Sequence, residues 1–133
     1  MKADQRISLA LLLLRLGVFL VMVMWTLDKF FNPQHGARVF AKFYFIGGLS
    51  QSAFYAIGGV ELLLLLGFLV GFHKRVTYGA VLLLHGISTL ASFPMYLAPF
   101  ANLLYFAGWP MLAACFALYS LRDLDTQWVV AAT

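Results

Sequence analysis

Three ionisable residues lie inside long apolar runs of the sequence, where a charge is costly. Glu61 lies near the head of GGVELLLLLGFLVGFHKR, residues 58–75, and Arg15 is the only charged residue in the run 7–27. His85 lies in a third apolar run. An ionisable group inside a membrane segment normally faces the protein interior and has a partner there, so each of these residues is a candidate for a functional site.

The three residues have similar depths when they are counted from the predicted cytoplasmic ends of their helices. Arg15 is about eight residues in, Glu61 about eleven and His85 about nine, or ~12–17 Å at 1.5 Å per residue. This coincidence predicts an intramembrane polar cluster in which Arg15 and Glu61 form a charge-assisted pair and His85 is the third member.

The cluster has two interpretations, and the sequence leaves both open. Arg15 and Glu61 can simply neutralise each other and fix the helix register, as buried ion pairs sometimes do, or they can serve a ligand. For His85, an interior histidine bonded to a neighbouring carbonyl or carboxylate is favoured over a ligand or a proton shuttle.

The composition indicates a membrane protein. Of the 133 residues, 63% are hydrophobic and only 11% are charged, and the mean hydropathy is +0.90, whereas soluble domains are ~25% charged. At ~20 residues per span, the chain has room for four helices in a single transmembrane domain, residues 1–133. We predict an all-α fold, an integral membrane four-helix bundle, with spans at about residues 7–27, 53–72, 76–97 and 102–121.

The connection between the first two spans has a helical pattern of its own. In ARVFAKFYFIGG, residues 37–48, Arg38 and Lys42 share one helical face and the apolar residues lie largely on the other. This pattern predicts a short amphipathic helix at the membrane interface. Further along, Pro94 is expected to end or kink the third helix, and Pro110 to bend the fourth.

Charge distribution predicts the topology. The run 7–27 is longer than the roughly 7–15 apolar residues of a cleavable signal peptide, so we interpret it as a retained first helix. A multi-pass protein of the cell inner (plasma) membrane with both termini in the cytoplasm satisfies the positive-inside rule by five basic residues to three. The inner five are Lys2, Arg6, Lys74, Arg75 and Arg122, and the outer three are Lys29, Arg38 and Lys42.

Several kinds of site are excluded. Cys115 is the only cysteine, so the chain has no internal disulfide, no C-x-x-C redox pair and no cysteine-based structural zinc site. The sequence has no metal motif and no interleaved basic and aromatic face for nucleic acid, and it requires no cofactor. The tail RDLDTQWVVAAT, residues 122–133, is predicted to form a surface turn, and no chemistry is assigned to it.

The sequence resembles the DoxX-like family of small four-helix membrane proteins over nearly its whole length. The matching features are an arginine in the first helix with a lysine at its far end, a G-x-E followed by a leucine and glycine run, a basic turn before the third helix, and the C-terminal ending. In this chain they are Arg15-Leu16-Gly17, Lys29, Gly59-Val60-Glu61, Gly67, Gly71, residues 73–75 and residues 119–123. The resemblance implies association with redox membranes, as in a small subunit of a thiosulfate:quinone oxidoreductase.

These observations lead to one preferred function and two alternatives. The preferred function is an accessory, non-catalytic membrane subunit of a redox system that binds a quinone or another lipophilic molecule near Arg15, Glu61 and His85. Its partners would be the lipid bilayer and a partner membrane subunit or a second copy of the chain, with no role for nucleic acid. The alternatives are a small oligomeric transporter or proton-coupled carrier, and a catalytic oxidoreductase subunit.

Overall fold

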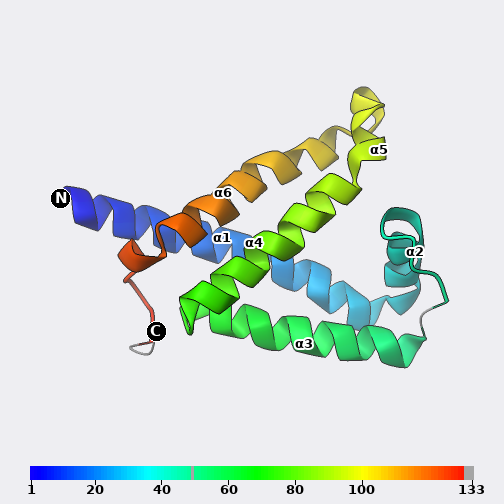
Figure 1. Ribbon diagram of the computed structural model, residues 1–133, viewed down its shortest axis with the longest axis horizontal. Helices are drawn as coiled ribbons and strands as arrows, with labels where there is room; N and C mark the ends of the chain where they lie inside the picture. The colour runs from blue at the N-terminus through cyan, green and yellow to red at the C-terminus, as the bar shows by residue number, and fades with distance from the viewer. Residues whose placement is uncertain (49, 131–133) are drawn as a thin grey trace.

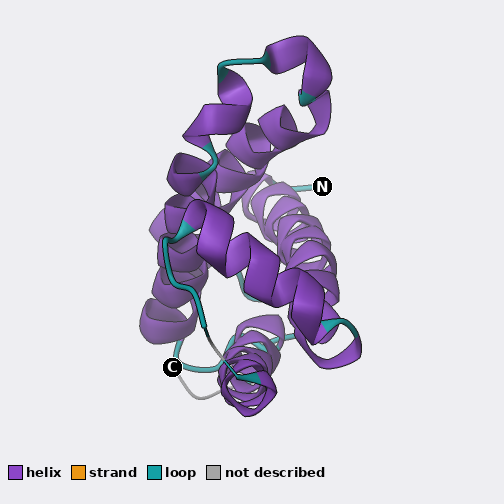
Figure 2. Ribbon diagram, turned by 90° about the vertical axis from the view of Figure 1, so that its right-hand side faces the viewer, coloured by secondary structure: helices purple, strands orange, loops and turns teal. Residues whose placement is uncertain are grey.

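The computed structural model describes residues 1–48 and 50–130, and within these residues the chain is helical with no strand (Figures 1 and 2). Its elements, in chain order, are α1 (Ala3–Phe31), α2 (Pro33–Phe43), α3 (Gln51–Leu69), α4 (Lys74–Ala91), α5 (Phe93–Tyr96), η1 (Pro99–Ala101), η2 (Leu103–Ala107), α6 (Gly108–Ser120) and η3 (Arg122–Leu124). The prediction of an all-α fold is confirmed for this part of the chain.

The long helices pack around a small apolar core. α3 runs back along the second half of α1, and α4 crosses from the end of α3 toward α5 (Figure 1). α6 then packs along α4 and reaches the first half of α1. The core side chains come from all four long helices: Leu11, Val18, Leu65, Phe68, Tyr78, Val81, Cys115 and Leu118.

Three helical stretches are long and apolar enough to cross a membrane: Ala3–Phe31, Gln51–Leu69 and the combined stretch Leu103–Ser120. α4 is also long, with 18 residues. It starts with Lys74 and Arg75 and carries the polar residues His85, Ser88 and Thr89, which lower its mean hydropathy. The prediction of membrane-spanning helices therefore holds by length and composition for three of the four predicted spans.

Around this core, many large apolar side chains lie on the outside of the bundle and several polar ones lie inside it. Large apolar side chains such as Leu13, Leu20 and Leu63 are mostly exposed. Polar side chains are buried between the helices: Ser8, Arg15, Thr26, Thr77, Thr89 and Asp125. Large apolar side chains exposed in such number are suited to contact with lipid or another protein.

The prolines lie where helices start. Pro33 and Pro94 are in the first turns of α2 and α5, where the missing N–H has no helical partner in any case. α4 ends at Ala91, just before Pro94, so the predicted break there is confirmed. Pro110 is the third residue of α6. The chain changes from the 3-10 turn η2 to the α-helix two residues before it, at Gly108.

α2 is the predicted amphipathic helix, although it starts earlier than expected, at Pro33, and ends at Phe43. It is docked against the start of α3. The ring of Phe40 packs edge-on against Phe54 with centroids 5.2 Å apart. Gly36 lies so close to Phe54 that a Cβ on it would be 3.4 Å from the ring.

The C-terminal tail is not the surface turn that its composition suggests. Residues 121–130 fold back toward the turn between α3 and α4, where the Val130 N–H donates a 2.8 Å hydrogen bond to the Val70 carbonyl. Gly71 has a positive φ of +68°, and a Cβ there would lie 2.6 Å from Val129. A glycine is therefore needed where the tail crosses the turn.

Candidate functional site

Arg15 is the largest fully buried side chain among the described residues, and most of its partners come from the C-terminal tail. Nη1 of Arg15 lies 2.5 Å from Oδ1 of Asp125, and both side chains are 0% exposed. The other carboxylate oxygen of Asp125 accepts a 2.5 Å hydrogen bond from the Tyr78 hydroxyl. Nη2 of Arg15 donates to the carbonyls of Gln127, at 2.6 Å, and Trp128, at 3.3 Å.

Two further contacts hold the tail in place. Nζ of Lys74 donates to the carbonyls of Asp125 and, at 3.2 Å, Arg122. The hydroxyls of Ser8 and Thr126 are 3.0 Å apart. The tail is thus fastened to α1 and α4, and its carboxylate compensates the buried charge of Arg15.

Glu61 lies in a separate site, so the predicted Arg15–Glu61 pair is wrong. Its Oε2 is 3.2 Å from Nζ of Lys29 and accepts a 3.1 Å hydrogen bond from the Thr26 hydroxyl. The Lys29 and Glu61 side chains are 13% and 22% exposed. This second pair joins the far end of α1 to the middle of α3.

The reason for the error is the register of the two antiparallel helices. Glu61 is level with Thr26, and Arg15 lies eleven residues before Thr26 on α1, which corresponds to about 16 Å at 1.5 Å per residue. α1 has 29 residues and α3 only 19. Because the two helices differ in length, equal counts from their ends do not correspond to equal depths in the bundle.

His85 belongs to a third site. Its Nε2 is 2.9 Å from the carbonyl oxygen of Gly108 at the start of α6, and because a carbonyl can only accept, Nε2 carries the proton. The Thr89 hydroxyl lies 3.2 Å from the same nitrogen and donates to the His85 carbonyl at 2.8 Å. This geometry agrees with the favoured interpretation, an interior histidine bonded to a neighbouring carbonyl.

Arg15, Glu61 and His85 thus have separate partners in three different parts of the bundle and form no common cluster. The partners that sequence reasoning missed for Arg15 are Tyr78 and Asp125. The sequence signal for Asp125 was indirect: four antiparallel helices return the C-terminal tail, with its carboxylate, to the N-terminal half of α1. Within residues 1–48 and 50–130, no group of three or more His, Cys, Asp and Glu side chains could hold a metal ion.

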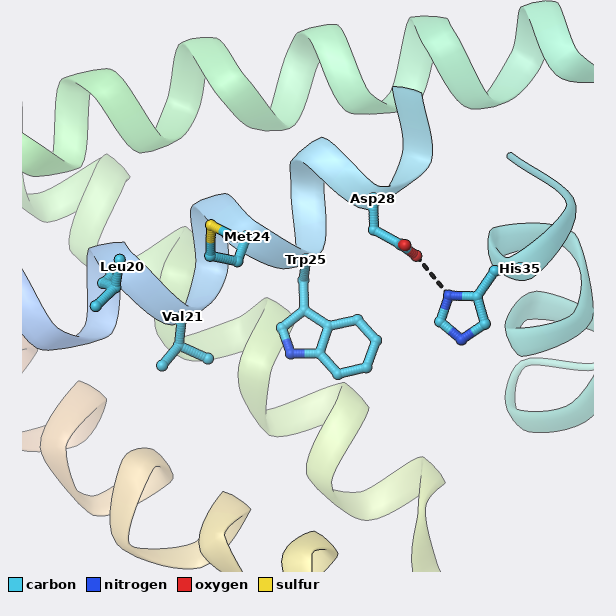
Figure 3. Close-up of a pocket in the computed structure, with 6 residues that line it drawn as sticks. All are labelled: Leu20, Val21, Met24, Trp25, Asp28 and His35. Carbon is cyan, nitrogen blue, oxygen red and sulfur yellow. Dashed lines mark hydrogen bonds and ion pairs between the residues drawn. The ribbon is translucent and has the colours of Figure 1, made fainter. Parts of the chain in front are cut away.

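A shallow, open hollow of about 440 Å³ lies on the surface beside the second half of α1 (Figure 3). It is lined by Leu20, Val21, Met24, Trp25, Asp28 and His35. At its polar end, Nδ1 of His35 lies 2.5 Å from Oδ2 of Asp28. The Trp25 ring stacks with the His35 ring at a centroid distance of 6.2 Å and an interplanar angle of 24°. The hollow therefore joins an apolar wall to an acid–histidine pair.

Comparison of the chain with protein-family models, curated proteins and solved structures returned no significant match. The resemblance to the DoxX-like family therefore rests on the sequence motifs alone.

Proposed function

We propose that the chain is a DoxX-like integral membrane protein, a four-helix bundle of the cell inner (plasma) membrane with both termini in the cytoplasm. In this arrangement α1, α3, α4 and the stretch 103–120 cross the bilayer, and α2 lies at the outer interface.

The side-chain directions of α4 support it as the fourth span. Its polar residues are turned inward, with His85 bonded to Gly108 and Thr89 buried. Its outer face is an apolar stripe of exposed side chains: Val76, Leu83, Ile87 and Leu90. A helix with this pattern meets lipid only through apolar groups, despite its modest mean hydropathy.

Cysteine labelling tests the topology. We expect an impermeant maleimide to label Arg38→Cys but not Arg75→Cys in intact spheroplasts, and to label both after permeabilisation, because the positive-inside rule places Arg75 in the cytoplasm. Both positions are exposed. A Cys115→Ala background removes the native thiol, which is buried. Labelling of position 75 but not position 38 in intact spheroplasts would contradict this topology and indicate the opposite orientation.

Within the membrane, the protein's proposed role is that of an accessory subunit of a redox system that binds a quinone or a similar lipophilic molecule. The observation that carries this proposal is the hollow beside α1, whose walls are apolar and whose polar groups lie at one end only. The hollow shares with small-molecule sites a mostly apolar lining and a few polar groups, and it is open to the surroundings of the bundle. The described charged groups inside the bundle are paired with each other, as in Arg15–Asp125 and Lys29–Glu61, which fits a supporting role.

Lipid analysis of the purified protein tests this function. We expect a membrane quinone to co-purify in near one-to-one amount when the protein is extracted into nanodiscs with its native lipids, because the apolar walls and polar end retain it. Mass spectrometry after solvent extraction measures the quinone. An unrelated four-helix membrane protein, prepared in the same way, gives the background from bulk lipid. A quinone content equal to that background would overturn the proposed function.

A further inference from the structure

The C-terminal tail lies beside the N-terminal half of α1. In Figure 1 it runs from the end of α6 toward the turn between α3 and α4. The Thr126 hydroxyl is 3.0 Å from that of Ser8, the second residue of the first apolar run. Arg15, which donates to two tail carbonyls, is seven residues after Ser8, or about 10 Å along the helix. In the proposed topology the tail is therefore level with the cytoplasmic end of this run, where headgroups meet acyl chains.

Most of the tail has no regular structure, so its backbone groups need other partners. After the 3-10 turn η3, residues 125–130 form no helix. At membrane depth, backbone polar groups must find partners in the protein or in water. Nη2 of Arg15 and Nζ of Lys74 bond four of the tail's carbonyls, those of Arg122, Asp125, Gln127 and Trp128. These contacts suit the tail to a place at the membrane boundary.

Trp128 is a large side chain that the tail turns outward. It is 75% exposed, and its φ of 55° is a left-handed conformation that is strained for a bulky residue. Such strain persists only where surrounding contacts fix the backbone, and here Arg15 donates to the Trp128 carbonyl. The next side chain, Val129, packs against Gly71 in the turn between α3 and α4. The tail's contacts thus hold the indole on the outside of the bundle.

An indole at this level has the chemistry of an interfacial anchor. Its ring is apolar and its Nε1–H is a hydrogen-bond donor, and tryptophan is enriched where headgroups meet acyl chains. Lys2, Arg6 and Arg75 are exposed at the same end of the bundle. Basic residues there attract the anionic headgroups of the cytoplasmic leaflet. The charge and the exposed ring together favour a lipid surface as the partner.

We propose that the tail is an interfacial membrane anchor, in which Arg15 and Lys74 hold the backbone and Trp128 inserts among the headgroups of the cytoplasmic leaflet. The inference rests on the membrane topology of the proposed function and is independent of quinone binding. It gives the buried Arg15–Asp125 pair a role beyond charge compensation. The pair fixes the segment that presents the indole to lipid.

Quenching of tryptophan fluorescence in nanodiscs tests the anchor. A Trp25→Phe/Trp109→Phe background leaves Trp128 as the only tryptophan. We expect lipid nitroxides near the headgroup to quench Trp128 at least twofold more strongly than nitroxides near the end of the acyl chain, because an anchored indole lies at the headgroup level. The neutral aqueous quencher acrylamide should quench it less than half as strongly as it quenches free tryptophan.

Trp25 is the control for membrane placement. It is 57% exposed near the other end of the first apolar run, and a Trp109→Phe/Trp128→Phe background isolates it. If lipid nitroxides quench Trp25 while acrylamide quenches Trp128 like free tryptophan, the anchor is wrong and the membrane topology stands. If lipid quenches neither tryptophan, the topology is overturned as well. If Trp128 is shielded from both kinds of quencher, protein such as a second copy covers it, and the lipid anchor is wrong.

A variant of the ion pair tests the role of Arg15. Asp125→Asn keeps the shape of the side chain and removes the charge that pairs with Arg15, so acrylamide should quench Trp128 at least twofold more strongly. Asp123→Asn, at an exposed carboxylate on the same tail, is the matched control and should leave quenching unchanged. Equal quenching in the two variants would overturn the role given to the pair. The comparison of Trp25 with Trp128 does not depend on this variant, so it decides the anchor even if Asp125→Asn does not fold.

Discussion

Replacing Asp125 with alanine is expected to destabilise the protein by about 3–5 kcal/mol, the cost of leaving a buried charge without its partner. The Arg15 side chain is 0% exposed, and among the described residues Asp125 is the only carboxylate paired with it. Its Nε atom already lacks a hydrogen-bond partner among the described residues. Loss of the carboxylate also leaves the Tyr78 hydroxyl without its acceptor. The expected result is a large loss of stability together with release of the tail.

Titration with SDS in mixed micelles measures the free energy of unfolding of each variant. Asp123→Ala is the matched control, because Asp123 is an exposed carboxylate two residues away, and we expect it to change the free energy by less than about 0.5 kcal/mol. The double variant Arg15→Met/Asp125→Leu should recover much of the lost free energy of unfolding, since removing both charges leaves no buried charge without a partner. Equal effects of Asp125→Ala and Asp123→Ala would mean that the carboxylate of Asp125 is hydrated.

Much of the helical framework follows from the sequence because it is encoded locally. The apolar run 7–27 lies inside α1, and the run 53–72 overlaps α3 almost completely. Pro94 marks the break after α4, since a residue without an N–H favours the first turn of a helix over its interior. The alternation of basic and apolar residues around Arg38 likewise predicts α2 as an amphipathic helix.

The candidate site was less predictable because its contacts depend on register and on the tail. Arg15, Glu61 and His85 each have a polar partner in the structure. The partner of Glu61 depends on how far α1 extends past α3, and the partner of Arg15 depends on the path of the tail. Asp125 lies in a short polar segment whose composition is that of a solvated turn. Nothing in hydrophobic periodicity distinguishes a carboxylate that folds back into the bundle from one that stays in water.

His35 was missed for a related reason. It lies seven residues after Asp28 and on a different helix, so helical spacing alone does not bring the two together. Their contact requires the chain to turn at Pro33 and α2 to dock on α3. The position of the acid–histidine pair is therefore a consequence of tertiary packing at Phe54.

Phe54→Ala is accordingly expected to destabilise the protein by about 3 kcal/mol, the cost of a large cavity at a packed aromatic. Phe54 is 1% exposed and contacts both Phe40 and Gly36 of α2. Without its ring α2 loses the surface on which it docks, so we expect the amides of residues 33–43 to exchange with deuterium much faster than those of α1 and α6. Leu63→Ala, on the same helix but 73% exposed, is the control and should change neither quantity appreciably. Unchanged exchange in α2 after Phe54→Ala would show that other contacts hold this helix, and the position of His35 beside Asp28 would then have to come from the turn at Asn32 and Pro33 alone.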